Sequence, residues 1–200
     1  KIVGEEIKFN INSEWPLTNI DPKKGYKRGT SGIFSCAYCG TTTTRDYVAK
    51  QACEFGLGVV NTALVAEGKN CRIYLDADYQ KFENYIESQP FDFDIKLSPN
   101  PRDLWCRNFG LKNVSDLFTN RQKLALNTFY ELLSKIESRV KEDAILAGFK
   151  NDNLGISEGG TGARAYAEAI KIYLTFALDK CSDYWSSVCS WSTTRQTIRC

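Results

Sequence analysis

The sequence TNRQKLALNTFYELLSKIESRVKEDAILAG, residues 119–148, decides the fold of the second half of this chain. Thr119 and Gln122 match a capping box, in which each side chain binds a backbone N–H that the first helical turn leaves unpaired. Apolar residues then recur at steps of three and four, and they are Leu126, Phe129, Leu133, Ile136, Val140, Ala144 and Ala147. This spacing places them on one face, so we predict an amphipathic helix of roughly 28 residues that ends at Gly148.

A second helical pattern begins near Gly162. Its apolar positions also recur at three and four residues, and they are Ala163, Tyr166, Ala167, Ile170, Leu174, Ala177, Leu178 and Cys181. Because residues 149–161 form a glycine-containing connection, we expect the two long helices to pack antiparallel. Ahead of them we expect a short helix over 78–87 and a proline-containing connector over 90–105. Residues 76–200 are therefore predicted to be mainly helical.

Residues 1–75 are predicted to be β-rich. Short apolar runs separated by turn residues mark strands, which are expected at 2–3, 7–11, 33–35, 57–66 and 71–75, with the last two forming a hairpin. One helix interrupts them, from its capping residue Thr44 to Phe55, and Gly56 ends it. Residues 15–32 are rich in Pro, Gly and Lys and are expected to form an exposed loop. The predicted fold class is thus α+β, with a small β-rich part followed by a helical part.

The composition excludes several kinds of chemistry. The chain has no histidine, so it offers no imidazole for a general base, a catalytic triad or a metal site. A net charge of +2 does not by itself indicate a nucleic-acid partner, so only local clusters support one. No apolar run approaches the roughly 18 residues that span a bilayer, so no membrane contact is expected. Because the chain starts at Lys1 and has no methionine, we expect a segment of a longer or processed protein.

The strongest local motif is Cys36-Ala37-Tyr38-Cys39-Gly40. Two thiolates on a tight turn that ends in glycine are typical of a zinc knuckle, which supplies half of a tetrahedral zinc site. Without histidine the other ligands have to be cysteine or carboxylate, and no second pair of cysteines has this spacing. We predict that Cys36 and Cys39 hold zinc as a half site. A redox or disulfide pair, or two ordinary thiols, are the alternatives.

Two other segments are candidates for binding anions. Residues 157–164 form a glycine-rich turn that opens a helix, where backbone N–H groups and the helix dipole favour a phosphate. Its candidate ligands are Gly159, Gly160, Thr161, Gly162 and Arg164, and the alternative is a plain connector closed by a Thr161 cap. The second segment is a basic loop that could bind a nucleic-acid backbone and stack an aromatic ring on a base, through Lys23, Lys24, Tyr26, Lys27 and Arg28. Its alternative is a solvated surface loop.

No catalytic centre is found in the sequence. A methyl transfer to an amino group needs a glycine-rich turn for its cofactor and a D/N-P-P-aromatic loop for its target. Asp21-Pro22-Lys23 and Asn100-Pro101-Arg102 both lack the second proline and the aromatic residue. We therefore predict no catalytic residue in this chain. The eight cysteines leave open a secreted disulfide scaffold, and we assign no role to Cys53, Cys71, Cys106, Cys181 and Cys200.

Five segments, in collinear order, resemble one family. They are Arg28-Gly29-Thr30 with the following Cys36–Gly40 motif, Asn100-Pro101-Arg102-Asp103-Leu104-Trp105, Asp116–Gln122, Gly159–Ala169 and Ser186-Ser187-Val188-Cys189-Ser190-Trp191. Together they resemble the adenine-specific DNA methylases that carry a zinc ribbon. Two positions depart from the family pattern, because Ala37 replaces the usual proline of the knuckle and Ser192 replaces the usual histidine after Ser190-Trp191.

The resemblance implies a central fragment of a longer enzyme. In that family the S-adenosylmethionine motif and the first knuckle come before the matched region, and the catalytic D-P-P-Y loop comes after it. The parent would transfer a methyl group from S-adenosylmethionine to the exocyclic amine of adenine in DNA. The fragment would supply zinc-ribbon, scaffold and DNA-contacting elements in the cytoplasm, next to the remainder of the parent chain. A stand-alone zinc-ribbon module that binds nucleic acid without catalysis is the alternative.

Overall fold

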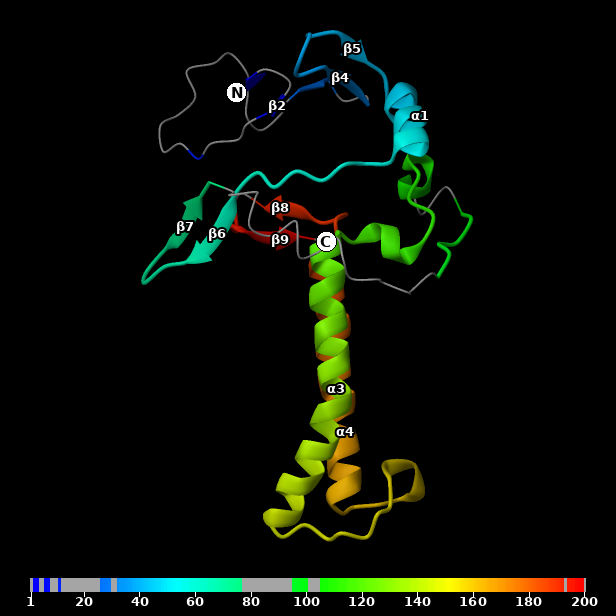
Figure 1. The fold of residues 1–200 in the computed structure, drawn as a ribbon, viewed down its shortest axis with the longest axis vertical. Coiled ribbons are helices and arrows are strands. Elements are labelled where there is room, and N and C mark those ends of the chain that lie inside the picture. Colours follow the sequence, from blue (N-terminus) through cyan, green and yellow to red (C-terminus); the bar gives the residue numbers. More distant parts are fainter. Residues whose placement is uncertain are drawn as a thin grey trace. The chain divides into compact units, whose positions relative to one another are not determined.

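The structure is a computed structural model that describes residues 2–3, 6–7, 11, 26–29, 32–76, 95–100, 105–192 and 194–199 (Figure 1). The chain divides into two compact units. The first unit contains the described residues up to 76 together with 96–113, and the second contains Ile95 and the described residues from 114 onward. Each unit has both helical turns and antiparallel strands, so the predicted α+β class is confirmed.

The first unit begins with small antiparallel sheets. Strands β1 (Ile2–Val3) and β2 (Glu6–Ile7) form a two-stranded pair, so a strand pair is found where it was predicted, but the second strand begins at Glu6, which was expected in the turn. Residues 8–10 of the strand expected at 7–11 lie outside the described residues, and Ile11 is not in a strand. Strands β3 (Lys27–Arg28), β4 (Ile33–Ser35) and β5 (Thr42–Thr43) form a sheet with the order β3-β4-β5.

The expectation of a loop throughout 15–32 is wrong at Lys27–Arg28. These two residues pair with Phe34 and Ile33, after a turn at Gly29 with φ +65°. Lysine and arginine have little strand preference of their own. Backbone pairing with the neighbouring strand β4 outweighs this low preference.

The predicted hairpin after residue 57 is confirmed, with a shorter first strand. Strand β6 (Leu64–Glu67) pairs with β7 (Arg72–Leu75) from Leu64↔Leu75 to Glu67↔Arg72. Residues 57–63 carry strand-like side chains but have no assigned secondary structure. The partner strand has only four residues, so only three of the expected ten, Leu64 to Ala66, find backbone partners, and Glu67 from the expected turn is the fourth paired residue.

Helix α1 (Arg45–Phe55) has the predicted limits. The Thr44 hydroxyl accepts a hydrogen bond from the backbone N–H of Tyr47, and Gly56 ends the helix at φ +78°. The helix contacts the 3-10 helix η1 (Trp105–Phe109), where the guanidinium carbon of Arg45 lies 4.0 Å from the centre of the Trp105 ring. Gly110 comes so close to α1 that a Cβ atom there would lie 2.9 Å from the carbonyl oxygen of Ala52.

The second unit is built on a helical hairpin. A 3-10 helix η2 (Val114–Leu117) leads to α3 (Asn120–Leu146), which has 27 residues and the complete capping box of Thr119 and Gln122. A connection with a 3-10 turn η3 (Ile156–Glu158) leads to α4 (Ala163–Tyr184). Both predicted long helices are therefore confirmed.

The two long helices pack antiparallel, side by side (Figure 1). In the first half of α3, Phe129 contacts Trp185, which follows α4, with 5.8 Å between ring centres. At the other end, Phe149 after α3 contacts Tyr166 in the first turn of α4 at 4.9 Å. Small residues make the close contacts of this hairpin, because Ala144, Ala163 and Ala167 are all less than 5 % exposed.

The second half differs from the sequence expectations at the start of α4 and after its end. Helix α4 has Gly162 as its N-cap without any side-chain hydrogen bond, so the alternative of a Thr161 cap is wrong. An antiparallel hairpin of β8 (Ser190–Ser192) and β9 (Thr197–Arg199), which the sequence pattern did not predict, follows α4. The helix expected over 78–87 lies outside the described residues.

None of the described helices is long and apolar enough to cross a membrane.

Candidate functional site

The Cys36–Gly40 turn connects strands β4 and β5 of the first unit. The pairing of Ser35 with Thr42 brings both ends of the turn together. The backbone N–H of Cys36 donates to the carbonyl of Thr41 at 2.8 Å, and that of Gly40 donates to the carbonyl of Cys36 at 2.9 Å. Gly40 has φ +72°, a backbone conformation that glycine adopts without the steric strain that other residues would have. The turn is therefore fixed by its backbone, independently of any ligand.

Both sulfur atoms of the turn lie close to polar partners. The backbone N–H of Tyr38 donates to Sγ of Cys36 at 3.4 Å, and the Cys39 thiol lies 3.1 Å from Oγ1 of Thr41. Hydrogen bonding with Thr41, followed by that with Cys36, lowers the pKa of the Cys39 thiol below its ordinary value. Cys39 is exposed and Cys36 is half-buried, so a metal ion or a reagent in solvent can reach this pair.

A complete metal site is not formed within the described residues. No group of three or more cysteine, aspartate or glutamate side chains lies close enough together there to hold an ion. Of the other cysteines, Cys53 donates its thiol to the carbonyl of Asn108 at 3.6 Å, and Cys71 lies in the turn before β7. None of the seven described cysteines is part of a disulfide. Two thiolates fit half of a tetrahedral zinc site, and two further ligands have to come from elsewhere.

The described members of the predicted basic segment lie on the edge of the same sheet. Lys27 and Arg28 form β3, and Tyr26 precedes it with 46 % of its surface exposed. The Arg28 Nε atom donates to the Ser35 hydroxyl, which ties this side chain to the strand that leads into the Cys36 turn. Lys23 and Lys24 lie outside the described residues. The structure thus brings Tyr26, Lys27 and Arg28 next to the cysteine turn.

The glycine-rich turn folds back on the connection that precedes it. The backbone N–H of Gly160 donates to the carbonyl of Gly155 at 2.9 Å, and that of Ala163 donates to the carbonyl of Lys150 at 2.8 Å. A Cβ atom on Gly160 would lie 2.2 Å from the carbonyl oxygen of Leu154, and one on Gly162 would lie 2.3 Å from that of Lys150. These two glycines are needed for close backbone packing, and two N–H groups that could have faced a phosphate bind protein carbonyls instead.

Arg164 has three protein partners in the same region. Its Nε atom lies 3.0 Å from Oε1 of Glu168, and its Nη1 atom donates to the carbonyl of Asn153 at 2.7 Å and lies 3.5 Å from Oε2 of Glu158. Glu168 also accepts the backbone N–H of Ile156 at 2.7 Å, which is the largest cause of its lowered pKa. The arrangement holds the 153–158 connection against the first turns of α4. Contact of Arg164 with phosphate stays a prediction.

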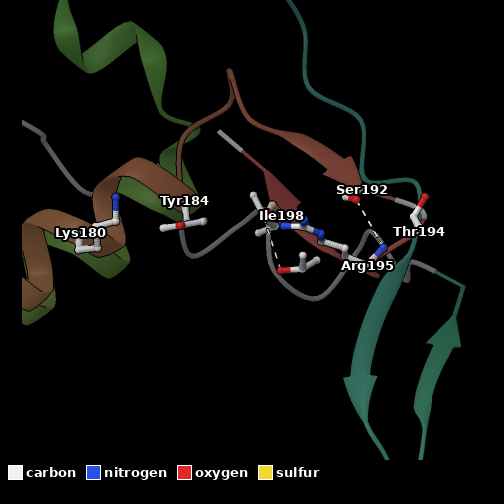
Figure 2. Close-up of a pocket in the computed structure, with 7 residues that line it drawn as sticks. Lys180, Tyr184, Ser192, Thr194, Arg195 and Ile198 are labelled. Carbon is white, nitrogen blue, oxygen red and sulfur yellow. Dashed lines mark hydrogen bonds between the residues drawn. The ribbon is translucent and has the colours of Figure 1, made fainter.

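The sequence analysis missed a second basic site. It lies at the end of α4 and on the β8–β9 hairpin, where Lys180 and Arg195 line a hollow (Figure 2). Neither residue belongs to the glycine-rich motif at 157–164 or to the cysteine motif at 36–40, so no local sequence pattern indicates them. Neither a protein family, nor a curated protein, nor a solved structure matches this chain.

Proposed function

We propose that this chain is a segment of an S-adenosylmethionine-dependent DNA methyltransferase that acts on the exocyclic amine of adenine. Within it, the Cys36–Gly40 turn contributes two zinc ligands, and nearby basic residues contact DNA. The observation that carries the zinc assignment is the geometry of Cys36 and Cys39, which share one backbone-fixed turn between two paired strands.

The electrostatics of the turn support zinc as the ligand. Zinc binds the thiolate form, and hydrogen bonding with Thr41 and Cys36 favours that form at Cys39 by lowering its pKa. The backbone-fixed turn also reduces the entropy that zinc binding has to overcome. When bound, zinc would act as a structural crosslink at the turn that joins the paired strands β4 and β5.

The surroundings of the turn support a nucleic-acid partner. Lys27 and Arg28 place two cations on β3, next to the strand that leads into the turn, and no carboxylate pairs with them among the described residues. Exposed Tyr26 offers a ring for stacking on a base. The methyltransferase assignment itself rests on the resemblance of the five segments, two of which form the capped start of α3 and the glycine-rich start of α4.

Titration with cobalt(II) tests the metal assignment. Cobalt replaces zinc in thiolate sites and gives a near-ultraviolet charge-transfer band for each sulfur ligand. The reduced chain should give a saturable band, and a Cys36→Ser, Cys39→Ser double variant should give none. The Cys53→Ser, Cys71→Ser double variant is the matched control and should behave like the unchanged chain. A band that survives loss of Cys36 and Cys39, or no band in the unchanged chain, would contradict the assignment.

A methylation assay tests the role of the segment. With labelled S-adenosylmethionine and adenine-containing duplex DNA, the 200-residue chain should transfer no methyl group, because it lacks a D-P-P-aromatic loop. The longer parent protein should transfer it, and the product should be N6-methyladenine. A parent that binds zinc and DNA without methylating DNA would favour the stand-alone zinc-ribbon module instead.

A further inference from the structure

A hollow of about 660 Å³ lies between the last turns of α4 and the β8–β9 hairpin, within the second unit (Figure 2). Six of its seven lining residues carry a cation or a hydroxyl group, and the seventh is Ile198. The six are Lys180, Tyr184, Ser192, Thr194, Arg195 and Thr197. No carboxylate is among the lining residues, so the hollow is suited to a ligand with negative charge and hydrogen-bond acceptors.

Regular backbone positions these side chains. Lys180 and Tyr184 are one helical turn apart and share a face of α4. Arg195 lies in the turn between β8 and β9, where its backbone N–H donates to the Ser192 hydroxyl at 3.4 Å and Ser192 pairs with Thr197. The segment between helix and hairpin is itself fastened, because the Cys189 thiol donates to the carbonyl of Asp183 at 2.7 Å.

The charge of the hollow comes mainly from Arg195. The Lys180 ammonium group lies 2.7 Å from a carboxylate oxygen of Asp183, in a pair whose side chains are 67 % and 56 % exposed. Such an exposed pair is weak and can be exchanged for another anion at low cost. The Arg195 guanidinium has no ion pair within the described part of the chain. Among the described residues, Arg195 thus lacks an ion pair, whereas Lys180 has Asp183 as a partner and lies 5.2 Å from the centre of the Tyr184 ring.

The exposure of the hollow distinguishes between kinds of ligand. Small-molecule sites enclose most of their ligand and are lined mainly by apolar side chains. Here Ile198 is the only aliphatic lining residue, and all of the lining residues except Ser192 are exposed. Arginine, lysine, serine, threonine and tyrosine side chains at an open surface are those that contact phosphates and sugars along a nucleic-acid backbone.

We propose that this hollow binds the phosphodiester backbone of a DNA strand, with Arg195 and Lys180 on phosphate oxygens and the hydroxyl of Thr194 donating to them. The inference rests on the proposed DNA-binding function and adds a contact surface in the second unit. It is independent of the zinc ligands, which lie in the first unit.

Fluorescence anisotropy with a labelled DNA duplex tests the proposal over a series of salt concentrations. Each phosphate contact releases counterions, so Arg195→Gln should weaken binding about eightfold near 0.1 M salt and reduce the salt slope by about 0.9. Arg195→Lys should retain most of the affinity. Arg139→Gln is the matched control, because it removes the same charge from an exposed side chain of α3, and it should change affinity less than about twofold.

Each outcome decides between alternatives. Equal losses in Arg195→Gln and Arg139→Gln would show a response to net charge alone and would overturn the site. Unchanged binding by Arg195→Gln, in a chain that does bind DNA, would overturn the site while leaving the proposed function in place. No binding by the unchanged chain at low salt would remove both. Displacement of DNA by micromolar inorganic phosphate would identify a free-phosphate site instead, and circular dichroism confirms that each variant is folded.

Discussion

The ammonium group of Lys171 on α4 lies 2.6 Å from Oε2 of Glu137 on α3, across 34 positions of sequence. It is an ion pair between the two long helices, and its side chains are 38 % and 34 % exposed. The hydrogen bond and the charge of Glu137 raise the pKa of Lys171 above its ordinary value. Because the protonated form is favoured in the folded chain, this contribution to stability is complete below the unfolded-state pKa and is lost as pH rises through the folded-state pKa.

We therefore expect Lys171→Met to lower the free energy of unfolding near neutral pH, by less than about 1 kcal/mol because solvent screens this half-exposed pair. The difference from the unchanged chain should shrink above about pH 10.4, where lysine loses its proton. Urea unfolding followed by circular dichroism at several pH values measures it. Lys135→Met, on the exposed side of α3, is the control and should show no such pH-dependent difference.

Glu168 should make the second unit sensitive to acid. Its carboxylate accepts the backbone N–H of Ile156 and pairs with Arg164, and these interactions depress its pKa below the ordinary 4.5. The stabilisation is present above the unfolded-state pKa and is lost as pH falls through the folded-state pKa. Glu168→Gln should therefore lower the melting temperature at neutral pH, and the two melting curves should converge in acid. If Glu142→Gln, an exposed control on α3, showed the same convergence, Glu168 would have no special role.

Gly160 should tolerate no side chain. A Cβ atom there would lie 2.2 Å from the carbonyl oxygen of Leu154, and backbone atoms cannot move aside as a flexible side chain can. We expect Gly160→Ala to cost about 1–3 kcal/mol of unfolding free energy, the usual range for forced overpacking. Ser157→Ala, in the neighbouring turn η3, also places an alanine in this region but without such a clash. Its free energy of unfolding should stay within about 0.5 kcal/mol of that of the unchanged chain. Denaturant unfolding of the two variants provides the comparison.

Thr41 should control the reactivity of Cys39. Because hydrogen bonding with Thr41 lowers the pKa of the Cys39 thiol, Thr41→Val should raise that pKa and slow alkylation of Cys39 near neutral pH. Peptide-resolved mass spectrometry after brief treatment with iodoacetamide measures the rate at Cys39 alone. Thr42→Val, one residue further on β5, is the matched control and should leave the rate unchanged. Equal slowing by both variants would point to a general disturbance of the turn.

Local signals predicted the elements whose causes are local. The capping box of Thr119 and Gln122 and the three- and four-residue apolar spacing act within a few residues, and α3 begins where they indicate. Thr44 and Gly56 bound α1 for the same reason. Strands depend on a partner elsewhere in the chain. Lys27–Arg28 therefore forms a strand where a loop was expected. The β8–β9 hairpin also forms, although no strong local pattern predicted it.

The candidate sites divide in the same way. The spacing of Cys36 and Cys39 was sufficient to predict a tight turn with two thiols, because the turn closes on its own backbone. The sequence could indicate only one of the three partners of Arg164, because Glu168 is four residues away on the same helix. Asn153 and Glu158 reach Arg164 only when the connection folds back. The joining of Lys180 to Arg195 in one hollow required the hairpin to fold against the end of α4.

The sequence by itself determined the α+β class, the two long helices and the pair of cysteines on one turn, because backbone propensity, apolar period and close spacing are properties of neighbouring residues. Only the tertiary structure decided which groups bind the glycine-rich turn and which cations share an open surface. Those relationships join residues distant in sequence, and they exist only once α3, α4 and the β8–β9 hairpin have packed together.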